Sequence, residues 1–456
     1  MIDPIMMSLS EAAAALGGST TAPEIGFARV TTDSRAIEPG DLFIALEGER
    51  FDAHDFVKGA LAAGAAAAVV KASWEGGDDL PLIRVDDTHR ALGQLAAFWR
   101  SKFTLPMAAI TGSNGKTTVK EMLASICAAA SSEPEVLATR GNLNNDIGVP
   151  LTLLRLCSEH RFAVIEMGMN HVGEICYLTK MGKPDVALVN NAAAAHLEGL
   201  GTVEGVARSK GEIFDGLGEQ GVAIINADDT YAPIWRELAG THKQLAFGLQ
   251  QGDVHATFKL AVFDSELTLH TPAGDISLKL GVPGLHNIRN ALAAATAALA
   301  MGIGLPDVKR GLENFAGVTG RLQHKQGRHG GVVIDDTYNA NPASMAEAIA
   351  VLANQPGTTC FVMGDMGEMG PDAPAMHAEI GELARQKGIK QLYCLGDLTT
   401  EAARAYGAGA RHFSQIEALL VALNDELAAG TAVLVKGSRF MKMERVVDFL
   451  TARAGT

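Results

Sequence analysis

The sequence has little of what marks a secreted, zinc-stabilised or nucleic-acid-binding protein. It has only five cysteines in 456 residues, an odd number with no C-x-x-C pair. This pattern argues against a disulfide framework or a structural zinc site and favours a reducing, cytoplasmic setting. Basic residues are also in deficit, with 38 Lys and Arg against 52 Asp and Glu and a net charge of −14. The chain therefore has no overall electrostatic reason to bind nucleic acid or an anionic membrane, and any bound phosphate needs local donors.

Long hydrophobic runs are missing as well. The segment that comes closest, residues 291–305, is interrupted by glycine and falls short of the ~20 residues that a membrane-spanning helix needs. The first basic residue is Arg29, so the N-terminal segment lacks the basic region of a signal peptide. We therefore expect a soluble cytoplasmic protein with no membrane segment and no nucleic-acid partner.

Glycine is abundant, at 50 residues, and the 47% of apolar residues is typical of a folded protein. At a prior of ~150 residues per domain, the length predicts about three domains. We place their boundaries at residues 1–105, 106–316 and 317–456. The first domain is expected to be small and mixed α/β, with strands at 42–46 and 82–85 and helices at 8–16 and 88–102.

The second and third domains both alternate strands with helices. Strands predicted at 107–111, 162–166, 185–190 and 222–226 indicate a parallel sheet with helices on both faces. Residues 255–280 read instead as an antiparallel appendage. The third domain has predicted strands at 331–335, 359–363, 391–395 and 432–436. It resembles a dinucleotide-binding fold in topology, but it lacks G-x-G-x-x-G, so a nicotinamide role is not supported.

The strongest motif is T-G-S-N-G-K-T-T, residues 111–118, which follows an apolar strand and opens a helix. That context suits a phosphate loop, in which backbone N–H groups and a lysine meet phosphate and a hydroxyl meets magnesium. The loop is G-x-x-G-K-T, shorter than the usual form, and a glycine-rich turn with a solvated lysine is the alternative. The candidate cofactor-binding residues here are Gly112, Asn114, Gly115, Lys116, Thr117 and Thr118.

Three further side chains could lie near this loop. Glu166 ends an apolar strand, where α/β sheets place ligands, and its carboxylate suits magnesium, although alone it would more often face solvent. His196, in N-N-A-A-A-A-H-L-E-G-L-G, could face the same crevice, although a structural histidine is the ordinary interpretation. Lys210, in A-R-S-K-G-E-I-F, would by itself read as a solvated helical charge.

Two asparagine-bearing segments complete the candidates. Asn287 and Asn290 share a helix face, where their amides could pair with adenine or cap the helix. Asp336 and Asn339 follow a strand of the third domain in V-I-D-D-T-Y-N-A-N-P. A turn is the alternative there, and the Asn341-Pro342 pair predicts the N-terminus of the next helix.

These motifs resemble, in order, those of the Mur ligases, and the resemblance covers nearly the whole chain. The phosphate loop is shared with folylpolyglutamate synthases. T-D-S-R…P-G-D-L-F-I-A-L-E-G-E-R-F-D-A-H-D-F, D-D-T-Y-N-A-N-P and V-L-V-K-G-S-R-F-M-K-M-E resemble the member that adds a dipeptide. Ala53 stands where that pattern has glycine, which raises a minor question about the backbone there.

The resemblance implies an α/β three-domain Mur ligase architecture: a UDP-substrate-binding N-terminal domain, a central ATP-binding domain and a C-terminal Rossmann-like domain. The implied reaction joins D-alanyl-D-alanine to UDP-N-acetylmuramoyl-tripeptide through an acyl phosphate, for peptidoglycan synthesis. The implied cofactors are ATP and two magnesium ions, and we expect a monomer. Catalysis would rest on positioning and charge neutralisation.

The resemblance also implies roles for single residues. Lys116 would hold the β- and γ-phosphates, Thr117 and Glu166 one magnesium, and His196 a second, with a carbamylated Lys210 as a further metal ligand. Asn287 and Asn290 would lie near adenine, and Arg321, Asp336 and Asn339 near the ribose and phosphates. The implied substrate contacts are Ser34, Arg35, Phe43, Asp52 and His54 for uridine and diphosphate, Asn142, Asn144 and Asn145 along the peptide path, and Lys436, Ser438 and Arg439 near the dipeptide.

Two other classes are weaker alternatives. A Mur ligase that adds meso-diaminopimelate would carry D-N-P-R, which the sequence lacks. A kinase or nucleotide switch would not need the third α/β domain together with His196 and Lys210. The third stem-peptide residue, meso-diaminopimelate or lysine, stays open.

Overall fold

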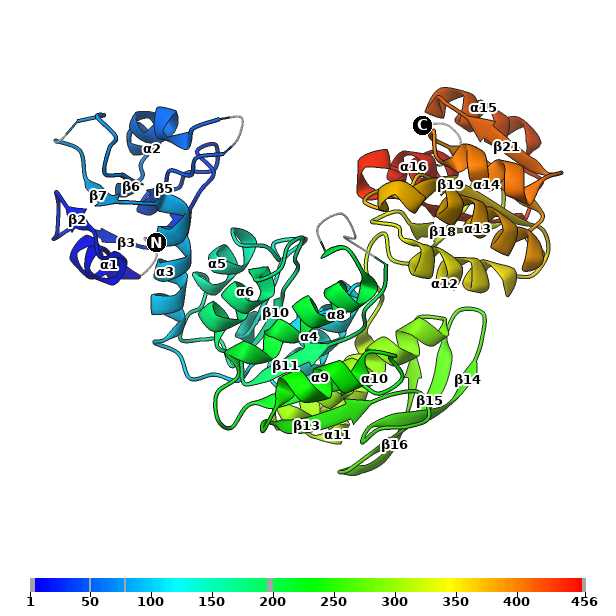
Figure 1. Ribbon diagram of the computed structural model, residues 1–456, viewed down its shortest axis with the longest axis horizontal. Coiled ribbons are helices and arrows are strands. Elements are labelled where there is room, and N and C mark those ends of the chain that lie inside the picture. The colour runs from blue at the N-terminus through cyan, green and yellow to red at the C-terminus, as the bar shows by residue number, and fades with distance from the viewer. Residues whose placement is uncertain (1–4, 49–50, 78, 195–199, 453–456) are drawn as a thin grey trace.

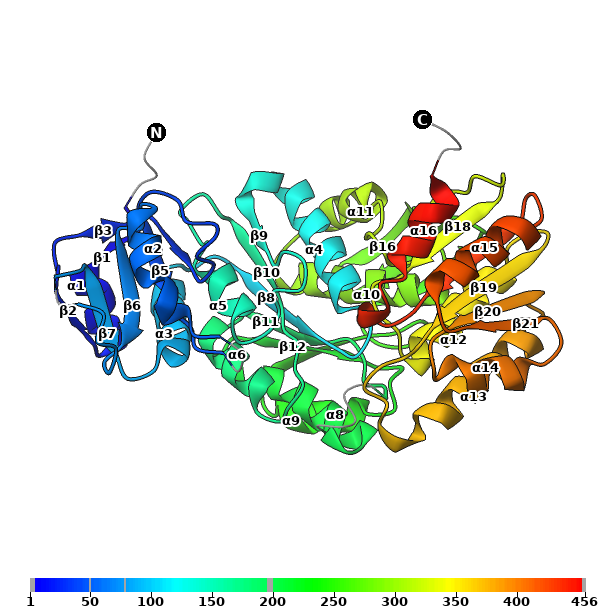
Figure 2. The same cartoon turned by 90° about the horizontal axis from the view of Figure 1, so that it is seen from above.

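The computed structural model describes residues 5–48, 51–77, 79–194 and 200–452, and it shows three α/β domains in a row (Figure 1). The N-terminal and C-terminal domains lie at opposite ends, with the middle domain between them (Figure 2). None of the described helices is long and apolar enough to cross a membrane. The predicted α/β class is confirmed.

The N-terminal domain is built on a five-stranded sheet in the order β2-β7-β6-β5-β4. All four residues of β5 are buried, which explains its apolar sequence, and the β4 to β7 pairings are parallel. Ser8 caps α1 by accepting from the N–H of Glu11, and Asp87 caps α3 in the same way. The elements are β1 (Met7–Ser8), α1 (Leu9–Leu16), β2 (Ser19–Thr20), β3 (Gly26–Phe27), β4 (Arg29–Thr31), β5 (Asp41–Ile44), α2 (Val57–Ala62), β6 (Ala67–Lys71), β7 (Leu82–Val85) and α3 (Thr88–Arg100).

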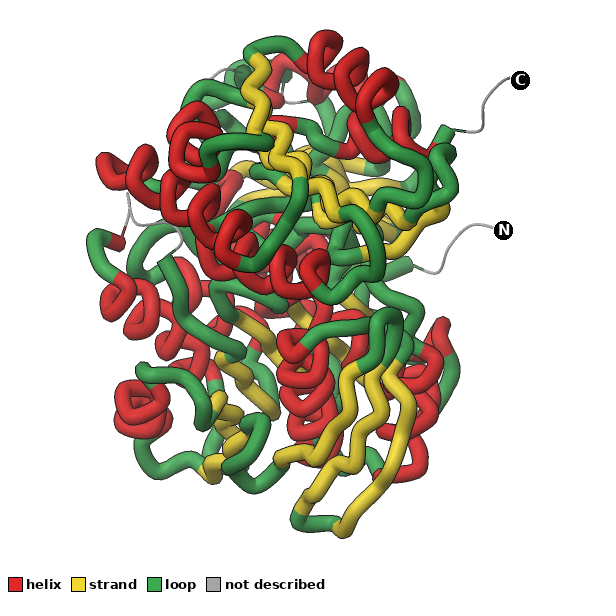
Figure 3. The backbone as a smooth tube through the Cα atoms, turned by 90° about the vertical axis from the view of Figure 1, so that its right-hand side faces the viewer, coloured by secondary structure: helices red, strands yellow, loops and turns green. Residues whose placement is uncertain are grey.

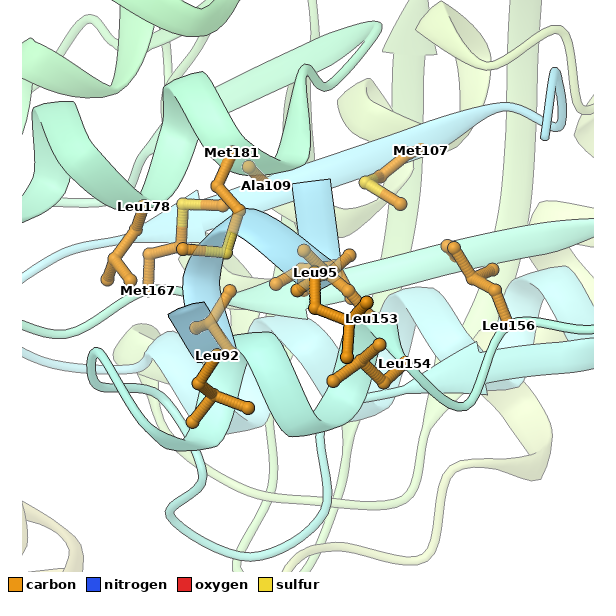
Figure 4. Packing of buried hydrophobic residues seen from close by; sticks show 14 of the residues in the cluster. Leu92, Leu95, Met107, Ala109, Leu153, Leu154, Leu156, Met167, Leu178 and Met181 are labelled. Carbon is orange, nitrogen blue, oxygen red and sulfur yellow. The ribbon is translucent and has the colours of Figure 1, made fainter. Parts of the chain in front are cut away.

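Helix α3 joins this domain to the next. Leu92 and Leu95 of α3 belong to the same buried cluster as Leu153 and Leu178 of the middle domain (Figure 4). The Arg100 guanidinium donates to the carbonyl of Gly182 at 2.9 Å. The two domains therefore share a continuous core.

The middle domain has a six-stranded, wholly parallel sheet in the order β13-β12-β11-β8-β10-β9. In β8, Ala109 packs into one core cluster and Ala108 and Ile110 into another, so helices cover both faces as predicted. The elements are β8 (Met107–Thr111), α4 (Lys116–Ala130), β9 (Val136–Ala138), α5 (Gly148–Leu153), β10 (Phe162–Glu166), α6 (Glu174–Gly182), β11 (Val186–Val189), α8 (Val203–Gly211), β12 (Val222–Asn226), α9 (Ala232–Ala239), β13 (Lys243–Phe247), α10 (Leu285–Ala300) and α11 (Leu305–Asn314).

Between β13 and α10 the chain forms the predicted antiparallel appendage, β14 (His255–Leu260), β15 (Ser265–Thr271) and β16 (Gly274–Leu280). Leu267 and Leu269 of β15 alternate with exposed or half-buried polar residues. This period of two is typical of a sheet with one buried face.

The C-terminal domain has a six-stranded sheet in the order β17-β18-β22-β19-β20-β21, in which the edge strand β17 is antiparallel. Figure 3 views the molecule from the C-terminal end and shows helices outside the strands of this domain. The four predicted strands are confirmed. The elements are β17 (Gln323–Gln326), β18 (Val332–Asp336), α12 (Pro342–Ala353), β19 (Thr359–Gly364), α13 (Ala373–Gln386), β20 (Gln391–Leu395), α14 (Thr399–Tyr406), β21 (Ala410–Phe413), α15 (Ile416–Glu426), β22 (Ala432–Lys436) and α16 (Glu444–Thr451).

Candidate nucleotide-binding and ligation site

The phosphate loop lies at the carboxyl end of β8, and α4 begins directly after it. Gly115 is the residue before α4 and has a left-handed φ of +78°, which favours glycine. A Cβ at this position would lie 2.6 Å from Nδ2 of Asn190 and closer still to Oδ1 of Asn290. The first N–H groups of α4 have no partner within the helix, so the loop presents donors to an anion.

Lys116 curls back over this loop. Its Nζ donates to the carbonyl of Gly112 at 2.6 Å. Burial lowers the pKa of Lys116, the charge of Arg321 lowers it further, and the charge of Glu166 opposes both. A bound phosphate would offer this ammonium a stronger partner than the loop carbonyl.

Glu166 ends β10 and is only 2% exposed. Asn144 donates from Nδ2 to Oε1 of Glu166 at 2.7 Å. The backbone N–H of Glu166 donates to the hydroxyl of Thr139 at 2.9 Å. Its second oxygen, Oε2, and the Thr111 hydroxyl are buried with no hydrogen-bond partner among the described residues. Burying oxygens without a partner is costly, and oxygen ligands suit magnesium. The donor chemistry therefore fits a cation beside the loop.

Lys210 lies on α8 and is 1% exposed. Burial is the main cause that holds the pKa of Lys210 well below its ordinary value, and the charge of Lys116 is the second. No hydrogen bond or ion pair joins its side chain to the described part of the chain. The solvated-charge interpretation is therefore wrong, because the side chain is buried and its surroundings disfavour the charged form.

His196 falls within 195–199, outside the described residues, so its predicted role is neither supported nor contradicted. Over the residues that are described, no group of three or more His, Cys, Asp and Glu side chains could hold a metal ion.

A cavity of about 370 Å³ lies between the middle and C-terminal domains, next to the phosphate loop. The predicted residues that line it are Asn114, Gly115, Thr118, Asn287, Asn290, Arg321, Asp336 and Lys436. Other lining residues were not predicted from the sequence, among them Asn190, Asn191, Asn226, Asp229 and Tyr231. They lie at or just beyond the carboxyl ends of β11 and β12, and this position at the ends of buried strands was a signal that could have identified them.

The C-terminal wall of the cavity is an ion pair. Lys436 Nζ lies 2.6 Å from Asp336 Oδ2 and donates to the carbonyl of Asn339 at 2.9 Å. Burial lowers the pKa of Lys436, and the charge of Asp336 opposes this effect. The Arg321 guanidinium stacks 4.1 Å above the ring of Tyr338. Asn339 thus contacts Lys436 through its backbone carbonyl and is not among the described residues that line the cavity.

Several predicted substrate residues have contacts within the protein. The Ser438 hydroxyl accepts from the N–H of Gly367 at 2.8 Å, and Arg439 pairs with Glu444. Asn145 accepts from the N–H of Gly148 at 2.9 Å and so shapes the start of α5. Asn142, by contrast, is exposed. Thr117, the predicted magnesium ligand, is partly buried at the start of α4.

The predicted uridine contacts lie in the N-terminal domain and divide into two kinds. Arg35 is largely exposed, pairs with Asp33 and lies next to the half-buried Ser34, so both could meet a ligand. Phe43 is fully buried in the domain core, which does not favour a contact with substrate.

His54 is also used by the fold. Its Nδ1 lies 2.5 Å from Asp52 Oδ1, and its Nε2 accepts from the N–H of Lys71 at 3.0 Å. Since Nε2 is the acceptor, Nδ1 carries the proton and donates to Asp52. Both ring nitrogens are therefore occupied within the domain.

The fold and the cavity define a three-domain phosphate-loop protein in which the cavity beside the loop is completed by the C-terminal domain. Three family models match the chain: the Mur ligase family catalytic domain at residues 27–100, the Mur ligase middle domain at 110–298, and the Mur ligase glutamate ligase domain at 320–439. The chain belongs to the Mur ligase family, as its motifs predicted.

Individual relatives match over nearly the full length. The UDP-N-acetylmuramoyl-tripeptide–D-alanyl-D-alanine ligase of Escherichia coli K12 is 44% identical over 451 residues, covering 98% of both chains. A crystal structure of MurF from Acinetobacter baumannii aligns with a TM-score of 0.92 at 39% identity, over 98% of this chain and 99% of that one. MurF from Thermotoga maritima in complex with ADP aligns at 0.82 with 27% identity, over 93% and 97%.

Proposed function

We propose that this protein is an ATP-dependent ligase that joins D-alanyl-D-alanine to UDP-N-acetylmuramoyl-tripeptide and so forms the pentapeptide precursor of peptidoglycan. The observation that carries the proposal is the full-length match to a relative named for this activity. The cavity beside the phosphate loop supports it, because it offers donors for phosphate and amides for a base.

Each domain has one task in this proposal. Residues 1–105 bind the UDP end of the substrate through the half-buried Ser34 and the exposed Arg35, residues 106–316 bind ATP, and residues 317–456 present the dipeptide near Ser438 and Arg439. Five free cysteines support a cytoplasmic protein. The protein acts as a monomer in this account.

The reaction runs in two balanced steps. A carboxylate oxygen of the tripeptide attacks the γ-phosphorus of ATP and ADP leaves, which gives an acyl phosphate. The amine of the dipeptide then attacks the acyl carbon, loses a proton and expels phosphate. Lys116 moves from the Gly112 carbonyl to the phosphates, and closure of the domains over the cavity keeps water from the acyl phosphate.

Magnesium would be held by Thr117 and by the unpartnered Oε2 of Glu166, with Asn144 holding the other carboxylate oxygen. When bound, it would supply positive charge to the phosphate oxygens. Lys210 would add a further oxygen ligand as a carbamate, formed when its neutral amine attacks carbon dioxide and releases a proton. Its burial and lowered pKa support that chemistry.

A substrate-omission assay tests the proposed function. The purified protein should release ADP only when UDP-N-acetylmuramoyl-tripeptide and D-alanyl-D-alanine are both present, and the product mass should equal the sum of the two minus water. Tripeptides ending in meso-diaminopimelate and in lysine should be run in parallel. A phosphorylated product formed without the dipeptide would identify a kinase instead, and use of a single amino acid would identify another Mur ligase.

A further inference from the structure

Asn341 joins the C-terminal domain to the phosphate loop of the middle domain. Its Nδ2 donates to Oδ1 of Asn114 at 2.8 Å, across 227 positions of sequence. Asn341 is only 7% exposed, so water competes little for this bond. Asn341 was not among the predicted site residues, because the sequence indicated only a helix cap for it.

The orientation of the Asn341 amide is fixed by its second task. Its Oδ1 accepts from the N–H of Ser344 at 2.9 Å, and its backbone N–H donates to the Ser344 hydroxyl, which together form a capping box on α12. Because the cap needs an acceptor, the oxygen must face the helix and the NH₂ group must face the loop. The same residue therefore caps α12 and donates across the domain boundary.

The backbone of Asn114 is held by hydrogen bonds within the middle domain. Its N–H donates to Oδ1 of Asn191 at 2.8 Å, and its carbonyl accepts from Nδ2 of Asn190 at 2.9 Å. Asn190 also donates to Oδ1 of Asn290. The loop backbone is thus fixed by asparagines of its own domain, while its side chain reaches the C-terminal domain.

We propose that Asn341 is a positioning residue of the ligation reaction, which latches the C-terminal domain onto the phosphate loop and couples nucleotide binding to domain docking. The position of the C-terminal domain that allows the Asn341–Asn114 hydrogen bond also brings Arg321, Asp336 and Lys436 to the cavity. A nucleotide that touches both walls stabilises this docked arrangement, and the latch in turn strengthens the binding of that nucleotide. The inference rests on the proposed function, since it requires that ATP fill this cavity.

Substitutions at Asn341 can separate the latch from the cap. Asn341→Ser keeps a good capping oxygen but is too short to reach Asn114, whereas Asn341→Ala loses both the cap and the latch. Asn341→Thr likewise keeps a capping oxygen and is too short to reach Asn114, so it checks the result of Asn341→Ser independently. Titration of the full-length protein with ADP gives the dissociation constant, and thermal unfolding without ligand reports the cap.

We expect Asn341→Ser, Asn341→Thr and Asn341→Ala to weaken ADP binding by a similar factor of about two to ten, the contribution of one hydrogen bond. Only Asn341→Ala should lower the melting temperature of the unliganded protein clearly. Normal ADP affinity in Asn341→Ser and Asn341→Thr, whether or not Asn341→Ala is weakened, would overturn the latch. Failure of the wild-type protein to bind ADP would instead overturn the proposed function.

Discussion

Replacing Gly115 with alanine tests whether the shape of the phosphate loop depends on the asparagines around it. A φ of +78° costs a residue with a side chain about 1–2 kcal/mol. The new methyl group would also lie 2.6 Å from Asn190 Nδ2, which must then move and lose hydrogen bonds worth about 0.5–1.5 kcal/mol each. With the two bonds that Asn190 Nδ2 donates, these terms predict that the middle domain loses about 2–5 kcal/mol of unfolding free energy.

Gly173 provides a matched control. It also precedes a helix, has a φ of +88°, and a Cβ there would meet nothing within 4 Å. Gly173→Ala should therefore carry only the backbone cost of about 1–2 kcal/mol and bind ADP normally. Calorimetric titration with ADP and thermal unfolding of both variants measure the difference. If Gly115→Ala binds ADP as well as Gly173→Ala and melts at the same temperature, the close approach of the asparagines does not shape the loop.

Four further outcomes follow from the same site. Lys116→Ala should reduce ligation by on the order of 10²-fold or more without lowering the melting temperature, as steady-state kinetics and thermal unfolding would show; near-normal turnover would refute the phosphate role. Lys210→Ala should be weakly active and partly rescued by small carboxylic acids. In buffer free of carbon dioxide, Lys210→Met should be more stable than the wild type at neutral pH. This advantage should shrink as the pH rises towards 10.5, because the lowered pKa makes folding of the lysine form release a proton; a pH-independent difference would contradict it. Finally, small-angle scattering should show a smaller radius of gyration when nucleotide and UDP-substrate are both present. The hinge would lie in residues 317–320, which join the middle and C-terminal domains and have a glycine of positive φ at each end, Gly317 and Gly320. An unchanged scattering curve would indicate a preformed site.

Much of the fold could be predicted because its strands are buried and apolar. β10, β12, β20 and β22 have the predicted bounds, since a run buried on both faces contrasts sharply with its polar flanks. The edge strands β17 and β21 were missed. Their sequences, Q-H-K-Q and A-R-H-F, are mostly polar because an edge strand faces solvent.

The site was only partly predictable, for a physical reason. Sequence order identifies a residue at a strand end, such as Glu166 or Asp336, but not whether its side chain faces the ligand or the protein. Phe43 and His54 lie in a motif typical of the family, yet the first is core and the second is bound at both nitrogens. The Asn114–Asn341 contact joins two domains and has no signature in local sequence.

Ligation through an acyl phosphate can be tested by an isotope-transfer experiment. UDP-N-acetylmuramoyl-tripeptide labelled with ¹⁸O in both oxygens of the reacting carboxylate is turned over with ATP and D-alanyl-D-alanine, and the inorganic phosphate is analysed by mass spectrometry. Because one carboxylate oxygen becomes the bridging oxygen of the acyl phosphate and leaves with phosphorus, the account predicts one ¹⁸O in each phosphate and the other in the new amide. Unlabelled phosphate alongside labelled pentapeptide would contradict the account.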